Sequence, residues 1–144
     1  MVFRIALNST KNVTIAEDIT QEVFIKVIEH HMIFESCEHE KAWLIRVTIN
    51  LCKSYFRTAW FRKTTDLTEE INTEDYITMT LEQQNLLEQL NQLKAQDRNI
   101  IYLYYYEEYS TQEIGELLGM NKNTVSTRLR RAKSKLKVLL KGDE

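Results

Sequence analysis

The stretch TQEIGELLGMNKNTVSTRLRRAKSKLKVLL, residues 111–140, decides the fold. Residues 111–118 predict a short helix, because Ser110 is a suitable N-cap and Gly119 follows directly as a suitable C-cap. A second helix is predicted over residues 122–140, where Asn121 can act as the cap and apolar residues recur every three or four positions. This apolar stripe consists of Val125, Leu129, Ala132, Leu136 and Leu140. Two helices joined by a short turn with glycine indicate a helix-turn-helix.

The second helix of this motif is strongly basic. Residues 121–141 contain no acidic residue and the basic residues Lys122, Arg128, Arg130, Arg131, Lys133, Lys135, Lys137 and Lys141, a local charge of +8. A solvated helix face normally carries both signs of charge. The segment therefore favours a nucleic acid as its ligand.

Four residues near the start of this helix are predicted to read bases. With the apolar stripe facing inward, they form two pairs one turn apart on the outer side, and a helix of this kind enters the major groove. Arginine suits guanine, and hydroxyls can bond to either type of base. The four residues are Ser126, Thr127, Arg130 and Arg131.

Other cations of the helix are expected to lie along phosphates, which gives affinity without sequence information. They are Lys122, Arg128, Lys133 and Lys137. For Arg128, an ion pair with Glu113 or Glu116 is an equally weighted alternative.

Composition places this motif in an all-α protein. The chain has 144 residues, no proline and three glycines, so it lacks the residues that β-turns require. No apolar run approaches the ~20 residues that span a bilayer, and no secretory signal is seen at the N-terminus. The two cysteines, Cys37 and Cys52, are too few for a disulfide framework. A cytoplasmic protein with reduced thiols is expected.

Two further amphipathic helices are predicted to cover the apolar side of the motif. Their apolar residues are Leu86, Leu87, Leu90 and Leu93, and then Ile100, Ile101, Leu103 and Tyr104. The tyrosines between residues 102 and 109 are able to stack on bases, but a place in the core with hydroxyls at the rim is the favoured interpretation.

The N-terminal part predicts a helix over residues 14–29. Its apolar face contains Ile15, Ile19, Val23 and Val27, with Phe24 and Ile28 widening it. The opposite face contains Asp18, Gln21, Glu22, Ile25 and Glu29. From composition alone, this face is equally well explained by solvation and by binding.

A second long helix is predicted over residues 41–62. Trp43, Leu44, Val47 and Leu51 make its apolar stripe. Basic residues interleave with aromatic ones, as suits a DNA backbone and unstacked bases; they are Arg46, Lys53, Tyr55, Phe56, Arg57, Trp60, Phe61 and Arg62. The segment after it, residues 64–80, is rich in threonine and acid and reads as a linker between two helical domains.

Three motifs carry a resemblance to a known family. Residues 16–24 (AEDITQEVF), residues 42–50 (AWLIRVTIN) and residues 111–132 follow one another in the order found in bacterial sigma factors of the sigma-70 family, extracytoplasmic-function group. The resemblance covers nearly the whole chain. It implies sigma region 2 over residues 1–63, short at its N-terminal end, a flexible acidic linker over 64–80, and sigma region 4 over 81–144.

The resemblance also implies partners and site residues. The protein would perform no covalent chemistry, need no cofactor, metal or small-molecule substrate, and bind RNA polymerase core and promoter DNA. Asp18, Gln21, Glu22 and Ile25 would bind the clamp helices of the largest subunit, and region 4 the flap region. The minus 10 element would be bound by the loop over residues 34–40 and by Phe34, Asn50, Arg57, Arg62 and Lys63. Ser126, Thr127, Arg130 and Arg131 match the minus 35 readers, and an anti-sigma factor is an expected partner.

The sequence departs from the family pattern at two places. The 34–40 loop (FESCEHE) is unusually acidic for a segment against DNA, and Lys94 stands where a proline is common.

Two other interpretations compete with this resemblance. A zinc or redox site at Cys37, His39 and Cys52 with His30 and His31 is disfavoured. No Cys-x-x-Cys spacing is present, and the two adjacent histidines fit the end of an amphipathic helix. A stand-alone dimeric helix-turn-helix regulator would explain the basic helix, but it leaves the acidic face of residues 14–29 without a role.

Overall fold

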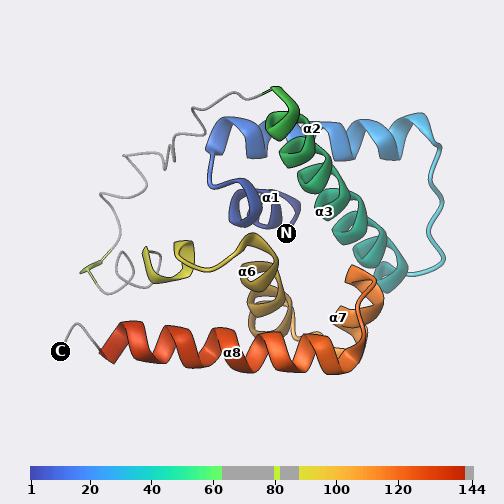
Figure 1. Ribbon diagram of the computed structural model, residues 1–144. Helices are drawn as coiled ribbons and strands as arrows, with labels where there is room; N and C mark the ends of the chain where they lie inside the picture. Colours follow the sequence, from blue (N-terminus) through green and yellow to red (C-terminus); the bar gives the residue numbers. More distant parts are fainter. Residues whose placement is uncertain (63–79, 82–87, 142–144) are drawn as a thin grey trace. The chain divides into compact units, whose positions relative to one another are not determined.

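The computed structural model describes residues 1–62, 80–81 and 88–141 (Figure 1). Every regular element in these ranges is helical, so the all-α prediction is confirmed. The chain divides into two compact units, Met1–Ile71 and Asn72–Glu144. The expected linker, apart from Thr80, lies outside the described residues, as do Lys63, Leu86 and Leu87.

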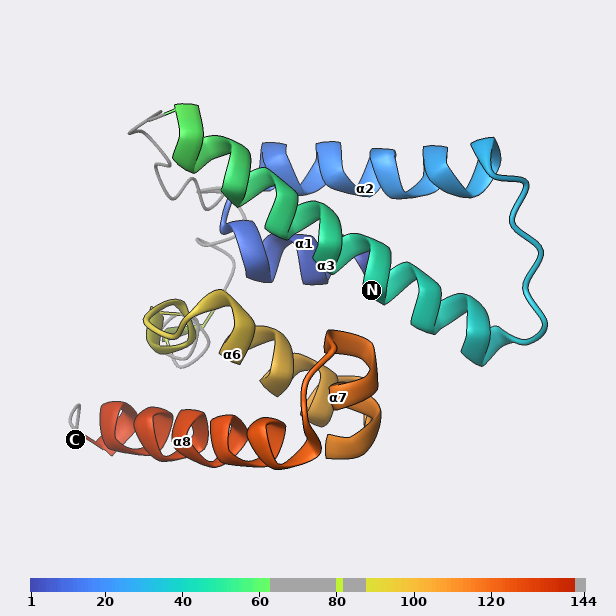
Figure 2. The same ribbon diagram turned by 45° about the vertical axis from the view of Figure 1, so that its right-hand side comes forward.

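The described part of the first unit, residues 1–62, contains the helices α1 (Val2–Thr10), α2 (Val13–Glu29) and α3 (Cys37–Arg62). Helix α1 packs against both others, and α3 crosses α2 (Figure 2). The Asn12 side chain caps α2, since its Oδ1 accepts a hydrogen bond from the Ile15 N–H at 3.0 Å. The buried apolar side chains of this unit are Val2, Ile5, Ala6, Ala16, Ile19, Val23, Leu44, Ile45, Ile49 and Cys52.

The buried face of α2 is narrower than predicted. Ile19 and Val23 are buried, which confirms the centre of the predicted stripe. Phe24 and Ile28 are 49% and 72% exposed, so the prediction that they widen this face was wrong. Each residue turns about 100° around a helix, which places both of them beyond the side that α1 and α3 cover.

Helix α3 begins at Cys37, so the prediction of a loop as far as Glu40 was wrong. The Ser36 Oγ accepts a hydrogen bond from the His39 N–H at 3.1 Å and thereby caps the helix. Glu38 and Glu40 then lie in the first turn, where the helix dipole favours acids. The acidic character of this segment thus has a local structural reason.

The predicted stripe of α3 is buried only in part. Leu44 is buried, whereas Val47 and Leu51 are half-buried. The helix has a broad contact surface because α1 and α2 both pack on it. Residues outside the predicted stripe that are also buried are Ile45, Thr48, Ile49 and Cys52.

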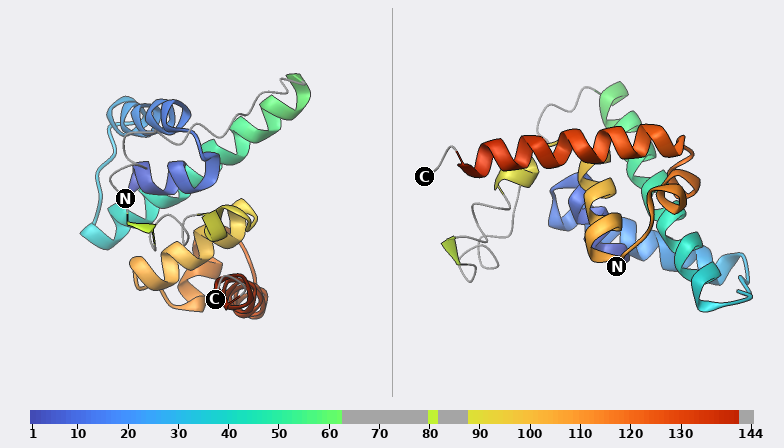
Figure 3. Two further views of the ribbon diagram at one scale, coloured as in Figure 1. Left: turned by 90° about the vertical axis from the view of Figure 1, so that its left-hand side faces the viewer. Right: turned by 90° about the horizontal axis from the view of Figure 1, so that it is seen from below.

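The second unit contains a helical stretch at residues 88–91, then α6 (Ala95–Ile101), the π-helix η1 (Tyr102–Tyr106), α7 (Thr111–Leu118) and α8 (Lys122–Lys141). Helices α6 and α7 pack on the same long helix, α8 (Figure 3). The buried apolar side chains include Leu93, Ile100, Leu103, Ile114, Leu117, Val125, Leu129 and Ala132.

The helix-turn-helix is confirmed together with its predicted caps. The Ser110 Oγ accepts from the Glu113 N–H at 3.1 Å, and the Glu113 carboxylate accepts from the Ser110 N–H at 3.0 Å. The hydrogen bond that the Glu113 carboxylate accepts from the Ser110 N–H, followed by one from the Ser110 hydroxyl, lowers the pKa of Glu113. Gly119 ends α7 in the left-handed conformation with φ 67°, and Asn121 accepts from the Asn123 N–H at the start of α8.

The tyrosine cluster is more exposed than predicted. Leu103 is the buried residue of η1, while Tyr104, Tyr105 and Tyr106 are exposed, so the prediction of a core position was wrong for these three. In η1 the Glu107 N–H donates to the Tyr102 carbonyl five residues back, as in a π-helix. This change of hydrogen-bond spacing alters which side chains face the core, and no helical periodicity in the sequence indicates it.

Candidate nucleic-acid interface

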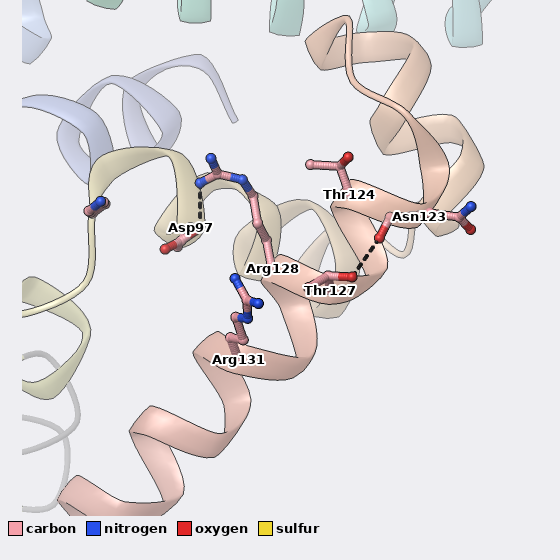
Figure 4. Close-up of a pocket in the computed structure, with 7 residues that line it drawn as sticks. Asp97, Asn123, Thr124, Thr127, Arg128 and Arg131 are labelled. Carbon is pink, nitrogen blue, oxygen red and sulfur yellow. Dashed lines mark hydrogen bonds and ion pairs between the residues drawn. The ribbon is translucent and has the colours of Figure 1, made fainter.

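A groove of about 500 Å³ runs between the start of α6 and the outer side of α8 (Figure 4). It brings together Thr127, Arg128 and Arg131, three of the residues that the sequence predicted to contact DNA. Three lining residues are cationic and one is acidic, so the groove favours an anion. The described residues that line it are Lys94, Asp97, Asn123, Thr124, Thr127, Arg128 and Arg131.

Arg128 forms an ion pair across this groove. Its Nη1 donates to the Asp97 Oδ1 at 3.3 Å, and the two side chains are 37% and 21% exposed. The alternative of an intradomain ion pair was therefore correct in kind, but the partner is Asp97 and not Glu113 or Glu116. The reason is that Arg128 faces α6, whereas those two glutamates lie on α7.

The Thr127 hydroxyl already has a hydrogen bond within its helix. It donates to the Asn123 carbonyl at 2.9 Å, as Figure 4 shows. Its donor is therefore in use, and its oxygen remains as an acceptor. Among bases, such an acceptor suits the amino groups of adenine and cytosine.

Ser126 and Arg130 lie outside the groove, one turn apart and both exposed on α8. Lys133, one turn further on, has its Nζ 5.2 Å from the centroid of the Tyr105 ring. A hydrogen bond to Tyr105 raises the pKa of Lys133. Lys122 and Lys137 are exposed as predicted. Of the predicted DNA-binding residues of α8, Thr127 and Arg128 are half-buried and the others are exposed.

The acidic face of the first unit is also accessible. Asp18, Gln21, Glu22 and Ile25 are all exposed on α2. Asp18 and Glu22 line a second groove, of about 260 Å³, between α2 and α3. Its remaining walls are Ile15, Ile19, Leu51, Ser54, Tyr55 and Thr58. The groove combines two carboxylates with apolar walls, which suits a cationic and apolar partner surface.

The predicted minus 10 residues are spread along α3. The half-buried Phe34 ring packs against His39 and Trp43, with centroid distances of 5.6 and 5.7 Å. Asn50 is exposed about two turns beyond Trp43 on the same side of the helix, and Arg57 is exposed further on. The side chain of Arg62 and the whole of Lys63 lie outside the described residues.

The described ranges contain neither a metal site nor a membrane-spanning helix. No group of His, Cys, Asp and Glu in this part of the chain is arranged to hold a metal ion. No helix of the described residues is long and apolar enough to cross a membrane.

Comparisons with known proteins show the family of the chain. The family model described as Sigma-70 region 2 matches residues 1–62, and the one described as Sigma-70, region 4 matches residues 83–136. The ECF RNA polymerase sigma factor SigL of Mycobacterium tuberculosis is 31% identical over 97% of this chain and 82% of its own length. SigW of Bacillus subtilis, also an ECF RNA polymerase sigma factor, is 30% identical over 97% of this chain and 83% of its own length. The chain belongs to the ECF RNA polymerase sigma factors.

A solved structure supports the fold of this sigma factor. The sigma factor RpoE of Bartonella quintana, in complex with the anti-sigma factor NepR, matches with a TM-score of 0.77 and 24% identity. The match covers 99% of this chain and 91% of that one. The all-α architecture is therefore shared.

Sequence reasoning missed two contributors to the candidate interface, Lys94 and Asp97, and favoured a core position for a third, Tyr105. Each lies far along the chain from the α8 residue that it accompanies. Asp97, for example, precedes Arg128 by 31 residues. Such contacts depend on how α6 and η1 pack on α8, and helical periodicity does not encode that packing.

Proposed function

We propose that this sigma factor directs RNA polymerase core to promoters by placing α8 in the major groove of the minus 35 element. The observation that carries this proposal is the exposed basic side of α8, with no acidic residue between positions 121 and 141. Ser126, Thr127, Arg130 and Arg131 read bases. Lys122, Arg128 and Lys133 contact phosphates.

Binding to polymerase core is proposed for the exposed face of α2. Asp18, Gln21, Glu22 and Ile25 would contact the clamp helices of the largest subunit, while the second unit contacts the flap region. Support comes from the groove beside Asp18 and Glu22, because carboxylates with apolar walls fit a basic, amphipathic helix. Core binding gives this face a role that a stand-alone DNA-binding protein would not need.

The minus 10 element is assigned to Phe34, Asn50, Arg57, Arg62 and Lys63. The packing of Phe34 on Trp43 supplies an aromatic surface beside the start of α3. Unstacking a base costs a few kcal/mol, which stacking and hydrogen bonds in a pocket must return. The exposed acids Glu35, Glu38 and Glu40 repel phosphates, so contacts at this end of α3 are made with bases rather than with the backbone.

Region 2 is assigned to residues 1–63, a linker to 64–80 and region 4 to 81–144. Both matched family ranges lie inside these bounds, and the boundary between the two compact units falls within the linker. The protein acts in the cytoplasm as an initiation factor without covalent chemistry. An anti-sigma factor is a further proposed partner, since the Bartonella RpoE was solved in complex with one.

A reconstituted transcription assay tests the proposal. The purified chain is incubated with genomic fragments, with and without RNA polymerase core, and start sites are mapped. Core-dependent initiation from a few sites that share two spaced elements is expected. Specific DNA binding by the chain alone, with no effect of core, would instead support a dimeric helix-turn-helix regulator, which family membership disfavours.

A further inference from the structure

Among the described residues that line the α6–α8 groove, Asp97 is the one that is acidic. It comes from the first turn of α6, opposite the DNA-facing side of α8. Lys94, Arg128 and Arg131 supply the positive charge of the groove, so a carboxylate there works against the binding of a phosphate.

The Asp97 carboxylate also binds the cation of Arg128, which would otherwise be able to contact a DNA phosphate. The Arg128 Nη1 donates to the Asp97 Oδ1 at 3.3 Å (Figure 4). Both side chains are partly exposed, and an ion pair of this kind is weak and exchanges readily. A phosphate entering the groove must therefore compete with Asp97 for the guanidinium group, while Arg131 lines the same groove from one turn further along α8.

We infer that Asp97 is an intramolecular competitor of the DNA backbone for Arg128, and that it lowers the sequence-independent DNA affinity of this sigma factor. The inference rests on the proposed function of α8 as the minus 35 reader. Phosphate contacts strengthen binding to every sequence equally, whereas base contacts discriminate. By restraining one phosphate contact, Asp97 increases the share of binding that depends on the promoter sequence.

Salt dependence distinguishes this competition from a general effect on structure. Each phosphate that a protein cation neutralises steepens the plot of log K against log salt by about 0.9. Asp97→Asn keeps the shape of the side chain and removes its charge. The variant should steepen the slope by about 0.9 and raise affinity about fivefold at low salt, because Arg128 becomes free for a phosphate.

The experiment uses holoenzyme assembled from the full chain and RNA polymerase core. Binding is measured by fluorescence anisotropy between about 50 and 200 mM salt, on a promoter fragment and on one with a scrambled minus 35 element. Asp97→Glu, which keeps the charge, should restore the wild-type slope. In an Arg128→Ala background, Asp97→Asn should leave the slope unchanged, because the competing cation is absent.

An equal gain in affinity on both fragments supports the inference. An unchanged or shallower slope, a loss of affinity, or a gain confined to the intact promoter would overturn it. Arg130→Ala in the same assay tests the proposed function separately. If that variant binds both fragments like the wild type, the minus 35 assignment fails; if it loses discrimination while Asp97→Asn changes nothing, the competitor role alone fails.

Discussion

At the scale of single residues, Glu22 gives the sharpest test of the polymerase-binding face. It is exposed on α2 and lines the groove with Asp18, so replacing it with lysine reverses charge without disturbing a buried contact. Glu22→Lys should reduce core affinity by at least about tenfold, because truncating or reversing a charge at an interface commonly costs 2 kcal/mol or more. Competition with the wild-type chain for core measures the loss.

Glu17→Lys is the matched control for this variant. It makes the same change on the same helix at an exposed position outside the groove. It should bind core almost as well as the wild type, with both variants unfolding at the wild-type temperature. Equal core affinity of the two variants would exclude the proposed polymerase face.

The two cysteines should differ in reactivity. Cys52 is 2% exposed, and burial raises the pKa of its thiol from the ordinary 9.0 to about 11, whereas Cys37 is exposed. Thiolate is the reactive form, so iodoacetamide at pH 8 should modify Cys37 quickly and Cys52 only after unfolding. Mass spectrometry of the modified sites measures this difference in reactivity, and equal rates at the two cysteines would contradict it.

The raised pKa of Cys52 also affects stability at high pH. Because the pKa is higher in the folded than in the unfolded chain, the thiol lowers the free energy of unfolding as pH rises from 9 towards 11. Below pH 9 it does not change the pH dependence of stability.

At the scale of helices, the turn of the helix-turn-helix depends on Gly115. A Cβ at this position would lie 2.6 Å from the Met120 carbonyl oxygen, in the backbone that leads into α8. Alanine normally stabilises a helix by about 1 kcal/mol relative to glycine. Here Gly115→Ala should lower the free energy of unfolding of the second unit by about 1–3 kcal/mol, because overpacking against backbone forces a shift.

The free energy of unfolding is measured by urea unfolding of the full chain, with hydrogen exchange of the α7 amides as the signal from the second unit. Glu116→Ala is the control, since it adds no atom to a tight contact and Glu116 is exposed on the same helix. Its stability should stay within about 0.5 kcal/mol of the wild type. A stabilising Gly115→Ala would show that the turn has room for a side chain.

Helix ends with strong local signals could be predicted from the sequence, and others could not. Ser110 and Gly119 bound α7 where expected, because capping depends on neighbouring residues. Helix α3 begins four residues earlier than predicted, because the family resemblance implied a loop over residues 34–40 and the Ser36 cap within it went unrecognised. The exposure of Tyr104 arises from the π-helix, a backbone arrangement that periodicity does not indicate.

At the scale of the whole molecule, a net charge of -2 conceals two surfaces of opposite sign. The acidic face belongs to the first compact unit and the basic helix to the second. On α8, helical spacing predicted the side chains that face solvent, whereas on α2 and η1 it wrongly placed Phe24, Ile28 and Tyr104 on a buried face. Which side chains of α8 are held by contacts within the protein could not be predicted, because the contacts of Asp97 and Tyr105 with α8 require the packed fold.

Two separate surfaces imply that their variants fail in different ways. Arg130 is exposed on α8 outside the groove, so Arg130→Ala should remove a base contact worth roughly 1–3 kcal/mol and leave core binding intact. Initiation should fall about tenfold or more at promoters that depend on the minus 35 element and change little where that element is already scrambled.

Glu22→Lys should reduce initiation at both kinds of promoter, because it acts before DNA is selected. In vitro transcription on the paired templates measures both patterns, with Lys137→Ala as the control for loss of one cation from the same helix. A uniform loss for Arg130→Ala would make Arg130 a phosphate contact, and would leave base reading to Ser126, Thr127 and Arg131.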